Sequence, residues 1–143
     1  MFTNILAAVD GSTCADNALK VAIDLAKGPG GHLTIVHAID PTSAALAEIQ
    51  PGHSLGIDPL RDAGNAILSA AVKKATEAGV KVSTQMVQGK AVEEVVDVAK
   101  RLHSDLIVIG SHGRKGLDRL LVGSVAEGVL REANAPTLVV HAP

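Results

Sequence analysis

The sequence Leu106-Ile-Val-Ile-Gly-Ser-His-Gly113 joins a short apolar run to two glycines. An uninterrupted apolar run of this length is typical of a strand buried on both faces, as in a parallel sheet. Gly110 and Gly113 permit the positive φ or the close approach that a tight anion-binding turn needs. The stretch therefore predicts a buried strand that ends in a candidate anion site.

Nine residues separate Gly113 from Gly123, and a helix is expected to begin at Ser124. The order Ser124-Val125-Ala126-Glu127 matches a capping box, in which the serine hydroxyl accepts a backbone N–H and the glutamate reaches back. The positive end of the helix dipole would then point at whatever lies above Gly123 and Ser124. This arrangement also favours an anion site.

Positive charge gathers between the two glycine motifs. Arg114, Lys115, Asp118 and Arg119 give three positive charges and one negative, a local balance of +2, whereas the formal net charge of the chain is −2. A surface connector with turn glycines, a serine cap and solvated basic residues would show the same features. The stretch alone leaves both interpretations open.

Strand and helix patterns alternate along the rest of the chain. Strand patterns occupy residues 5–9, 33–39, 80–88, 106–109 and 138–140, and helix patterns occupy residues 15–26, 63–78, 92–102 and a last segment from Ser124 to Asn134. Five strands joined by right-handed helical crossovers predict an α/β fold: an open, doubly wound, parallel five-stranded sheet with helices on both faces, forming a single domain over residues 1–143. Residues 80–88 alternate apolar with polar, which favours an edge strand. Thr13 and Asp16 could cap the first helix.

Composition predicts a small protein with an aliphatic core. Hydrophobic residues make up 47% of the 143 residues, but Phe2 is the only aromatic residue. Platforms for base stacking are therefore absent, and a pI of about 6.3 argues against a basic groove. We accordingly expect no nucleic-acid partner.

Several features favour the cytoplasm. The apolar runs are far shorter than the roughly 20 residues of a spanning helix, and the first residues lack the basic region of a signal peptide. No membrane association is therefore expected. Cys14 is the only cysteine, so no disulfide can form within the chain, which fits a reducing compartment. We expect Cys14 to be a small buried residue rather than a reactive thiol.

Taken with the rest of the chain, the glycine motif resembles the nucleotide-binding signature of universal stress proteins of the ATP-binding type. The signature residues are Gly110, Gly113, Gly123 and Ser124, and further landmarks lie at residues 5–10, 36–40 and 136–140. The resemblance covers nearly the whole chain and implies the strand order 3-2-1-4-5. In that order the chain reverses between strands 1 and 4, so a ligand should bind beyond their carboxyl ends, at Asp10 and Gly110.

The resemblance also implies roles for individual residues. Gly110, Gly113, Gly123 and Ser124, with the amide of Val125, would hold ribose and phosphates. Asp10 would bind ribose hydroxyls or a phosphate-bound Mg²⁺, and a loop or helix cap is its alternative role. The backbone N–H and C=O of Ala38 would form hydrogen bonds with the edge of the adenine base. Gly89 would lie near the face of the base. His112 lies between Gly110 and Gly113 in the glycine motif and could donate a hydrogen bond to a phosphate.

Other chemistries find no support in the sequence. No Gly-Lys-Ser/Thr follows the glycines, no G-x-G-x-x-G follows the first strand, and no G-x-S-x-G elbow is present, which disfavours a P-loop, NAD binding and a hydrolase nucleophile. The histidines lack the spacing of zinc ligands. The connection from Pro41 to Pro59 is long and is either a lid or an idle linker.

These observations predict a cytoplasmic, ATP-binding, dimeric stress-response protein that acts as a nucleotide-responsive regulator, with an unidentified protein partner as a further option. AMP or another adenine nucleotide is an alternative ligand. Two other functions remain open: a slow Mg²⁺-dependent ATPase, disfavoured because no general base beyond Asp10 is evident, and a dimeric interaction module that binds no nucleotide. The dimer would pair the C-terminal strand, Thr137 to His141, which is apolar on both faces.

Overall fold

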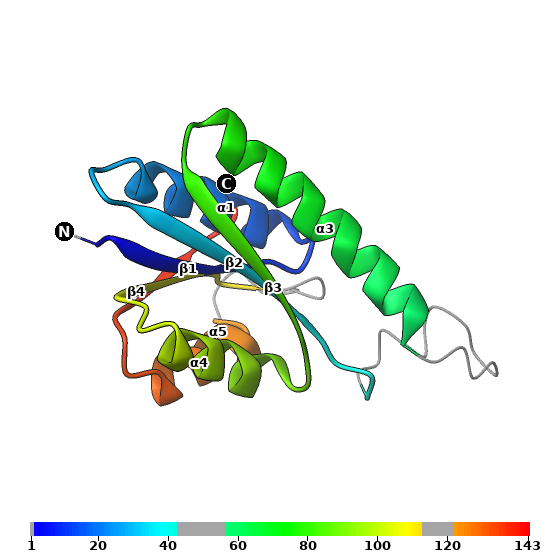
Figure 1. Cartoon of the computed structure of the whole chain (residues 1–143). Helices are drawn as coiled ribbons and strands as arrows, with labels where there is room; N and C mark the ends of the chain where they lie inside the picture. Colours follow the sequence, from blue (N-terminus) through cyan, green and yellow to red (C-terminus); the bar gives the residue numbers. More distant parts are fainter. Residues whose placement is uncertain (1, 43–56, 113–121) are drawn as a thin grey trace.

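The computed structural model describes residues 2–42, 57–112 and 122–143 (Figure 1). Five parallel strands form one sheet in the order β3-β2-β1-β4-β5, which confirms the predicted fold. The strands are β1 (Asn4–Ala8), β2 (His32–Ile39), β3 (Lys81–Gln88), β4 (Leu106–Gly110) and β5 (Thr137–Val140). The helices are α1 (Thr13–Ala26), α3 (Asp58–Glu77), α4 (Ala91–Arg101) and α5 (Ser124–Glu132).

The sheet is the middle of three layers. Helices α1 and α3 cover one face, and α4 and α5 cover the other (Figure 1). Successive side chains of a strand point to opposite faces, so the central strands supply both cores. Ile5 and Ala7 pack under α1 and α3, whereas Leu6 packs over α4 and α5. This explains why the central strands are almost uninterruptedly apolar.

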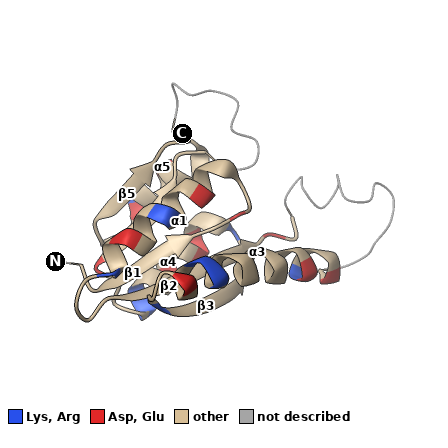
Figure 2. Ribbon diagram, turned by 90° about the horizontal axis from the view of Figure 1, so that it is seen from above, with Lys and Arg blue, Asp and Glu red and all other residues tan. Residues whose placement is uncertain are grey.

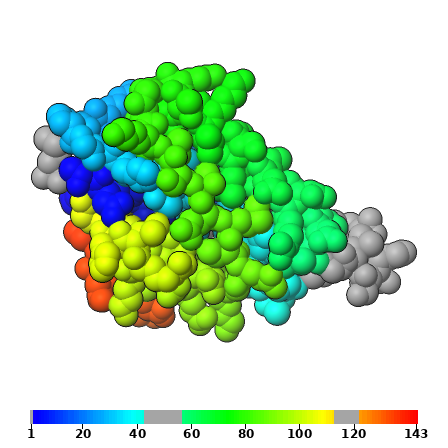
Figure 3. Space-filling model, in the orientation of Figure 1, coloured from blue at the N-terminus to red at the C-terminus, as the bar shows by residue number. Residues whose placement is uncertain are grey.

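The two edge strands differ in exposure. β3 is the longer edge, and each of its residues is exposed or half-buried, as expected of an edge strand, although the two classes do not strictly alternate. In the space-filling view, β3 and α3 cover much of the face turned to the viewer (Figure 3). At the other edge, in β5, Leu138 is 39% exposed to solvent. β5 ends at Val140, one residue short of the segment predicted to pair in the dimer, Thr137 to His141.

Two predicted helix starts are wrong. Helix α3 begins at Asp58 rather than near residue 63, and includes Pro59 in its first turn. Proline is tolerated there because the N–H that it lacks would have no partner within the helix. Helix α1 is capped by Ser12, whose Oγ accepts the Ala15 N–H at 3.1 Å, rather than by Thr13 or Asp16. Most of the connection from Pro41 to Pro59 lies outside the described residues.

Charged side chains are mixed along the helices. In the view from above, acidic and basic residues follow one another along α3 (Figure 2). Exposed pairs link Asp24 to Lys27 at the C-terminal end of α1 and Asp97 to Arg101 on α4. Such surface pairs contribute little to stability. Within the described ranges, no helix combines the length and the apolar character needed to span a membrane.

Candidate functional site

The carboxyl ends of β1 and β4 lie side by side at the centre of the sheet. The strands pair in parallel, with Ala7 opposite Val108. The next strands lie on opposite sides of this pair: β2 lies beside β1, and β5 lies beside β4. Open α/β sheets bind ligands at such a switch point. Gly110 is the last residue of β4 and Asp10 lies two residues after the end of β1, so both residues border the switch point.

Gly110 packs against the first turn of α1. A Cβ at this position would lie 2.8 Å from the carbonyl carbon of Cys14 and 2.9 Å from the backbone nitrogen of Ala15. Only glycine permits this close approach, and its φ is not positive. The bare backbone of Gly110 therefore brings α1 to the switch point. Cys14 is buried there, as expected of a small apolar residue.

Ser111 connects several elements at the switch point, a role that the sequence pattern did not indicate. Its N–H donates to the Val140 carbonyl at 2.8 Å, and its carbonyl accepts the Gly123 N–H at 2.6 Å. Its Oγ lies 3.1 Å from Nδ1 of His112 and 3.8 Å from Sγ of Cys14. Ser111 is 1% exposed. The only sequence signal is a small polar residue directly after a buried strand.

One ring nitrogen of His112 has no hydrogen-bond partner among the described residues. Nδ1 faces the Ser111 hydroxyl, whereas Nε2 is buried and makes no hydrogen bond within the described part of the chain. A buried nitrogen that lacks a partner carries a desolvation cost, which a ligand atom would relieve. The next residue, Gly113, and the basic residues at 114, 115 and 119 lie outside the described residues.

The predicted capping box at the start of α5 is wrong. The N-cap is Gly123, with φ of −64° and ψ of 160°, and no side chain of the described residues caps the helix. Glu127 instead pairs with Arg131, with 2.6 Å between Oε1 and Nη2. The reason is that the bond from Gly123 to Ser111 places Ser124 inside the helix. The N–H groups of the first turn thus have no side-chain cap, and such groups bind anions.

Asp10 contributes to the turn between β1 and α1. Its Oδ1 accepts the Ser12 N–H at 2.8 Å, and Gly11 takes a φ of 83° in this turn. One carboxylate oxygen therefore caps the loop by accepting a backbone hydrogen bond, which is the alternative role that the sequence left open for Asp10. The side chain is half-buried. Among the described residues, none hydrogen-bonds Oδ2 of Asp10.

Ala38 has backbone groups that point beyond the end of β1. The Val36 carbonyl accepts the Val9 N–H at 2.9 Å, on the β1 side, and the Ile39 carbonyl accepts the Gly89 N–H at 2.8 Å, on the β3 side. Backbone groups of successive strand residues point alternately to the two neighbours. The N–H and C=O of Ala38 therefore point to the β1 side, where that strand has already ended.

The β3 side of the same region contains two tight turns. Gly89 has a φ of 147°, and a Cβ there would clash with the carboxylate of Glu94, so this turn requires glycine. After β2, the Asp40 carboxylate accepts bonds from the Thr42 hydroxyl at 2.6 Å and the Thr42 N–H at 2.9 Å. These bonds, together with the positive charge of Lys90, hold the pKa of Asp40 below its usual value.

No protein-only metal site is found in residues 2–42, 57–112 and 122–143, because no three His, Cys, Asp or Glu side chains come together there. Asp10 is the single carboxylate at the switch point among the residues named above. Mg²⁺ commonly binds through one or two carboxylates plus substrate phosphates, so Asp10 alone fits a phosphate-bound ion rather than a resident one.

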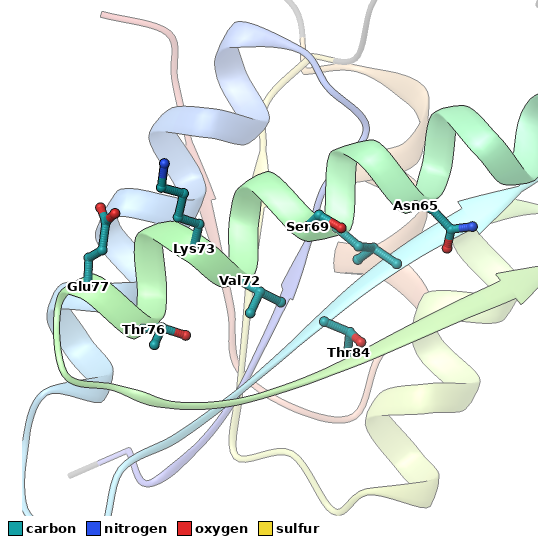
Figure 4. Close-up of a pocket in the computed structure, with 8 residues that line it drawn as sticks. Asn65, Ser69, Val72, Lys73, Thr76, Glu77 and Thr84 are labelled. Carbon is teal, nitrogen blue, oxygen red and sulfur yellow. The ribbon is translucent and has the colours of Figure 1, made fainter.

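A separate groove of about 480 Å³ lies between α3 and β3 (Figure 4). Val72 and Thr76 point toward the sheet, whereas Lys73 and Glu77 point to the opposite side of the helix (Figure 4). None of the predicted nucleotide-binding residues lines this groove. It therefore adds nothing to the site at the switch point.

Comparison with known proteins identifies the family. The family model described as "Universal stress protein family" matches residues 1–141. This chain belongs to the universal stress protein family. The match includes both strand ends at the switch point and the start of α5, so the geometry described above is that of a universal stress protein domain.

Individual relatives are similar to this chain over nearly its whole length. Universal stress protein MJ0531 of Methanocaldococcus jannaschii is 34% identical over 143 residues, which covers 100% of this chain and 84% of the relative. The solved structure of hypothetical protein MJ0577 has a TM-score of 0.86 and 29% identity, and covers 100% of this chain and 98% of that one. The universal stress protein of Archaeoglobus fulgidus in complex with dAMP has a TM-score of 0.74 and 25% identity, and covers 97% and 98%.

Proposed function

We propose that this universal stress protein binds an adenine nucleotide, ATP in the first instance, at the switch point between β1 and β4. The first turn of α5, which no described side chain caps, supports this proposal most directly, because its N–H groups lie beside the carboxyl end of β4. The described residues in the proposed site are Asp10, Ala38, Gly110, His112, Gly123, Ser124 and Val125, and Gly113 is proposed from the sequence alone.

Each part of a nucleotide has a matching group at the switch point. The N–H groups of Ser124 and Val125 would donate hydrogen bonds to phosphate oxygens. The buried Nε2 of His112 would donate a hydrogen bond to a further phosphate oxygen. Oδ2 of Asp10 would accept a ribose hydroxyl. The N–H and C=O of Ala38 match the acceptor and donor on the edge of an adenine base. The dAMP complex of the A. fulgidus protein, a relative at 25% identity, supports this choice of ligand class.

The biological role is proposed on the same basis. A nucleotide-responsive regulator needs binding without rapid turnover, and Asp10 already uses one oxygen in the loop, which makes it a poor general base. We therefore favour a cytoplasmic, dimeric regulator over a slow Mg²⁺-dependent ATPase. A dimeric interaction module without nucleotide remains the outcome to expect if the switch point binds nothing.

Two measurements test the proposal. Mass spectrometry of material released from freshly purified protein should detect an adenine nucleotide, and calorimetry should detect binding of ATP with Mg²⁺ and of AMP. Steady-state hydrolysis should fall well below the ordinary enzyme range of about 1 to 1000 s⁻¹. Turnover within that range would favour the ATPase, and absence of any adenine nucleotide binding would refute the proposed function.

A further inference from the structure

His37 lies next to Ala38 on β2 and reaches back to the end of β1. Its Nδ1 lies 2.8 Å from the carbonyl oxygen of Val9. A carbonyl oxygen only accepts, so Nδ1 carries the proton and donates. The half-buried imidazole therefore holds the backbone of the residue that directly precedes Asp10.

This bond occupies an acceptor that the sheet would otherwise use. The Val9 N–H donates to Val36 at 2.9 Å. In a parallel ladder, a residue that donates to one position of its neighbour accepts from the position two residues further along, which here is Ala38. That second bond does not form, and the ladder ends with Ala8 opposite Val36.

We propose that His37 is a positioning residue of the nucleotide site. By taking the Val9 carbonyl, its imidazole stops the β1–β2 ladder and leaves the Ala38 N–H free for the acceptor on the adenine edge. The same bond fixes the peptide that carries Asp10, so one side chain sets both the base contact and the ribose contact. This inference rests on the proposed function, because it assumes that an adenine nucleotide occupies the switch point.

Helix α3 provides the room that the imidazole needs. A Cβ at Gly64 would lie 2.8 Å from Cδ2 of His37 and 2.9 Å from Cε of Met86. The methionine end can move aside, but the ring is held at Nδ1 by its bond to Val9. Gly64 therefore lets α3 pack closely on β2 while the imidazole keeps its bond.

Two substitutions at residue 37 separate the donor from the rest of the side chain. His37→Val removes the donor and suits a strand, so the ladder should close between Ala38 and Val9. His37→Asn keeps a donor at about the position of Nδ1. Calorimetry should show about a tenfold loss of AMP affinity for His37→Val and less than about a threefold loss for His37→Asn.

Base preference gives a measurement that a purely structural role would not change. Inosine monophosphate carries a hydrogen at N1 where AMP has an acceptor, so the wild-type protein should prefer AMP. That preference should shrink in His37→Val, because the Ala38 N–H no longer faces the base. Equal AMP affinity and unchanged preference in a folded His37→Val protein would overturn the proposal.

Amide hydrogen exchange in the nucleotide-free protein keeps the two proposals distinguishable. The Ala38 amide should exchange freely in the wild type and in His37→Asn, and should become protected in His37→Val. Protection of this amide in the wild type would overturn the role of His37 whatever the ligand. If exchange behaves as expected but the wild type binds neither AMP nor ATP, the proposed function fails, and the positioning role fails with it.

Discussion

At the scale of single residues, crowding explains the glycines better than backbone conformation does. Neither Gly110 nor Gly123 has a positive φ. Each lies where a Cβ would meet backbone, at α1 in the first case and at the Ser111 carbonyl, 2.8 Å away, in the second. The glycine motif thus serves the packing of β4, α1 and α5 as well as the proposed phosphate contact.

Gly123→Ala tests this double role. The added Cβ must push the turn away from Ser111, so we expect a loss of about 1 to 3 kcal/mol in the free energy of unfolding and weaker ATP binding. Urea denaturation and calorimetry measure the two effects. Glu132→Ala is a control in the same helix, since this residue is exposed and lies at the opposite end of α5 from the proposed site. A Gly123→Ala protein with unchanged stability and affinity would exclude both roles.

Asp10 can be tested by separating its charge from its hydrogen bond. Asp10→Ala removes both, and should lower ATP affinity by about 1 to 3 kcal/mol. Asp10→Asn keeps an acceptor for the Ser12 N–H, so it should preserve the loop and isolate the effect of charge on nucleotide or Mg²⁺ binding. Calorimetry with and without Mg²⁺ makes the comparison. If Asp10→Ala changes thermal stability but not affinity, Asp10 is only a loop cap.

At the scale of elements, helix α3 shows how a packing requirement can override local propensity. Gly64 lies in the interior of α3 and is buried. Alanine there would normally stabilise a helix by about 1 kcal/mol. The contact with His37 opposes that gain, because the ring is 2.8 Å from the position of the new Cβ.

A double-mutant cycle measures this opposition. Gly64→Ala should destabilise the wild type by about 1 kcal/mol, because the destabilisation from overpacking exceeds the stabilisation from the higher helix propensity of alanine. In a His37→Ala background the space is vacant, and the same substitution should be neutral or stabilising. Chemical denaturation of the four proteins gives the coupling free energy. A coupling near zero would show that the ring and α3 do not constrain each other.

At the scale of the whole molecule, the proposed dimer depends on the outer side of β5. The Pro136 carbonyl accepts the N–H of Ile107 in β4 at 2.9 Å, and the Val140 carbonyl accepts the N–H of Ser111, directly after β4, at 2.8 Å. Backbone groups of the residues between them alternate, so the N–H and C=O of Val139 point away from the sheet. The carbonyl of His141 is taken by the Asn17 side chain at 2.6 Å, so the free edge is shorter than the sequence indicated.

Val139→Pro should therefore break the dimer and spare the domain. Proline removes an outward N–H without removing a bond to β4, so we expect a folded monomer by light scattering. Val140→Pro is the control, because it removes an N–H that faces β4 and should destabilise the fold itself. A wild type that is monomeric at micromolar concentration, or a Val139→Pro protein that remains a dimer, would place the interface elsewhere.

The sequence by itself determined the order of strands and helices, the apolar faces and the glycine motif. The periodicity of apolar residues is a local property, so it can be recognised from neighbouring residues in the sequence. Similarity to the family then supplied the strand order. Even there, the cap of α5 could not be predicted from its local pattern, because Ser111 takes the Gly123 N–H and moves the helix start.

Only the tertiary structure decided how the switch point is built. The bond from His37 to Val9, the space left by Gly64 and the approach of Gly110 to α1 join residues that lie far apart in the chain. Hydrogen bonds and close contacts depend on distances of a few tenths of an ångström, and packing between elements sets those distances. The residue types at these positions are visible in the sequence, but the partner that each one meets depends on the folded arrangement.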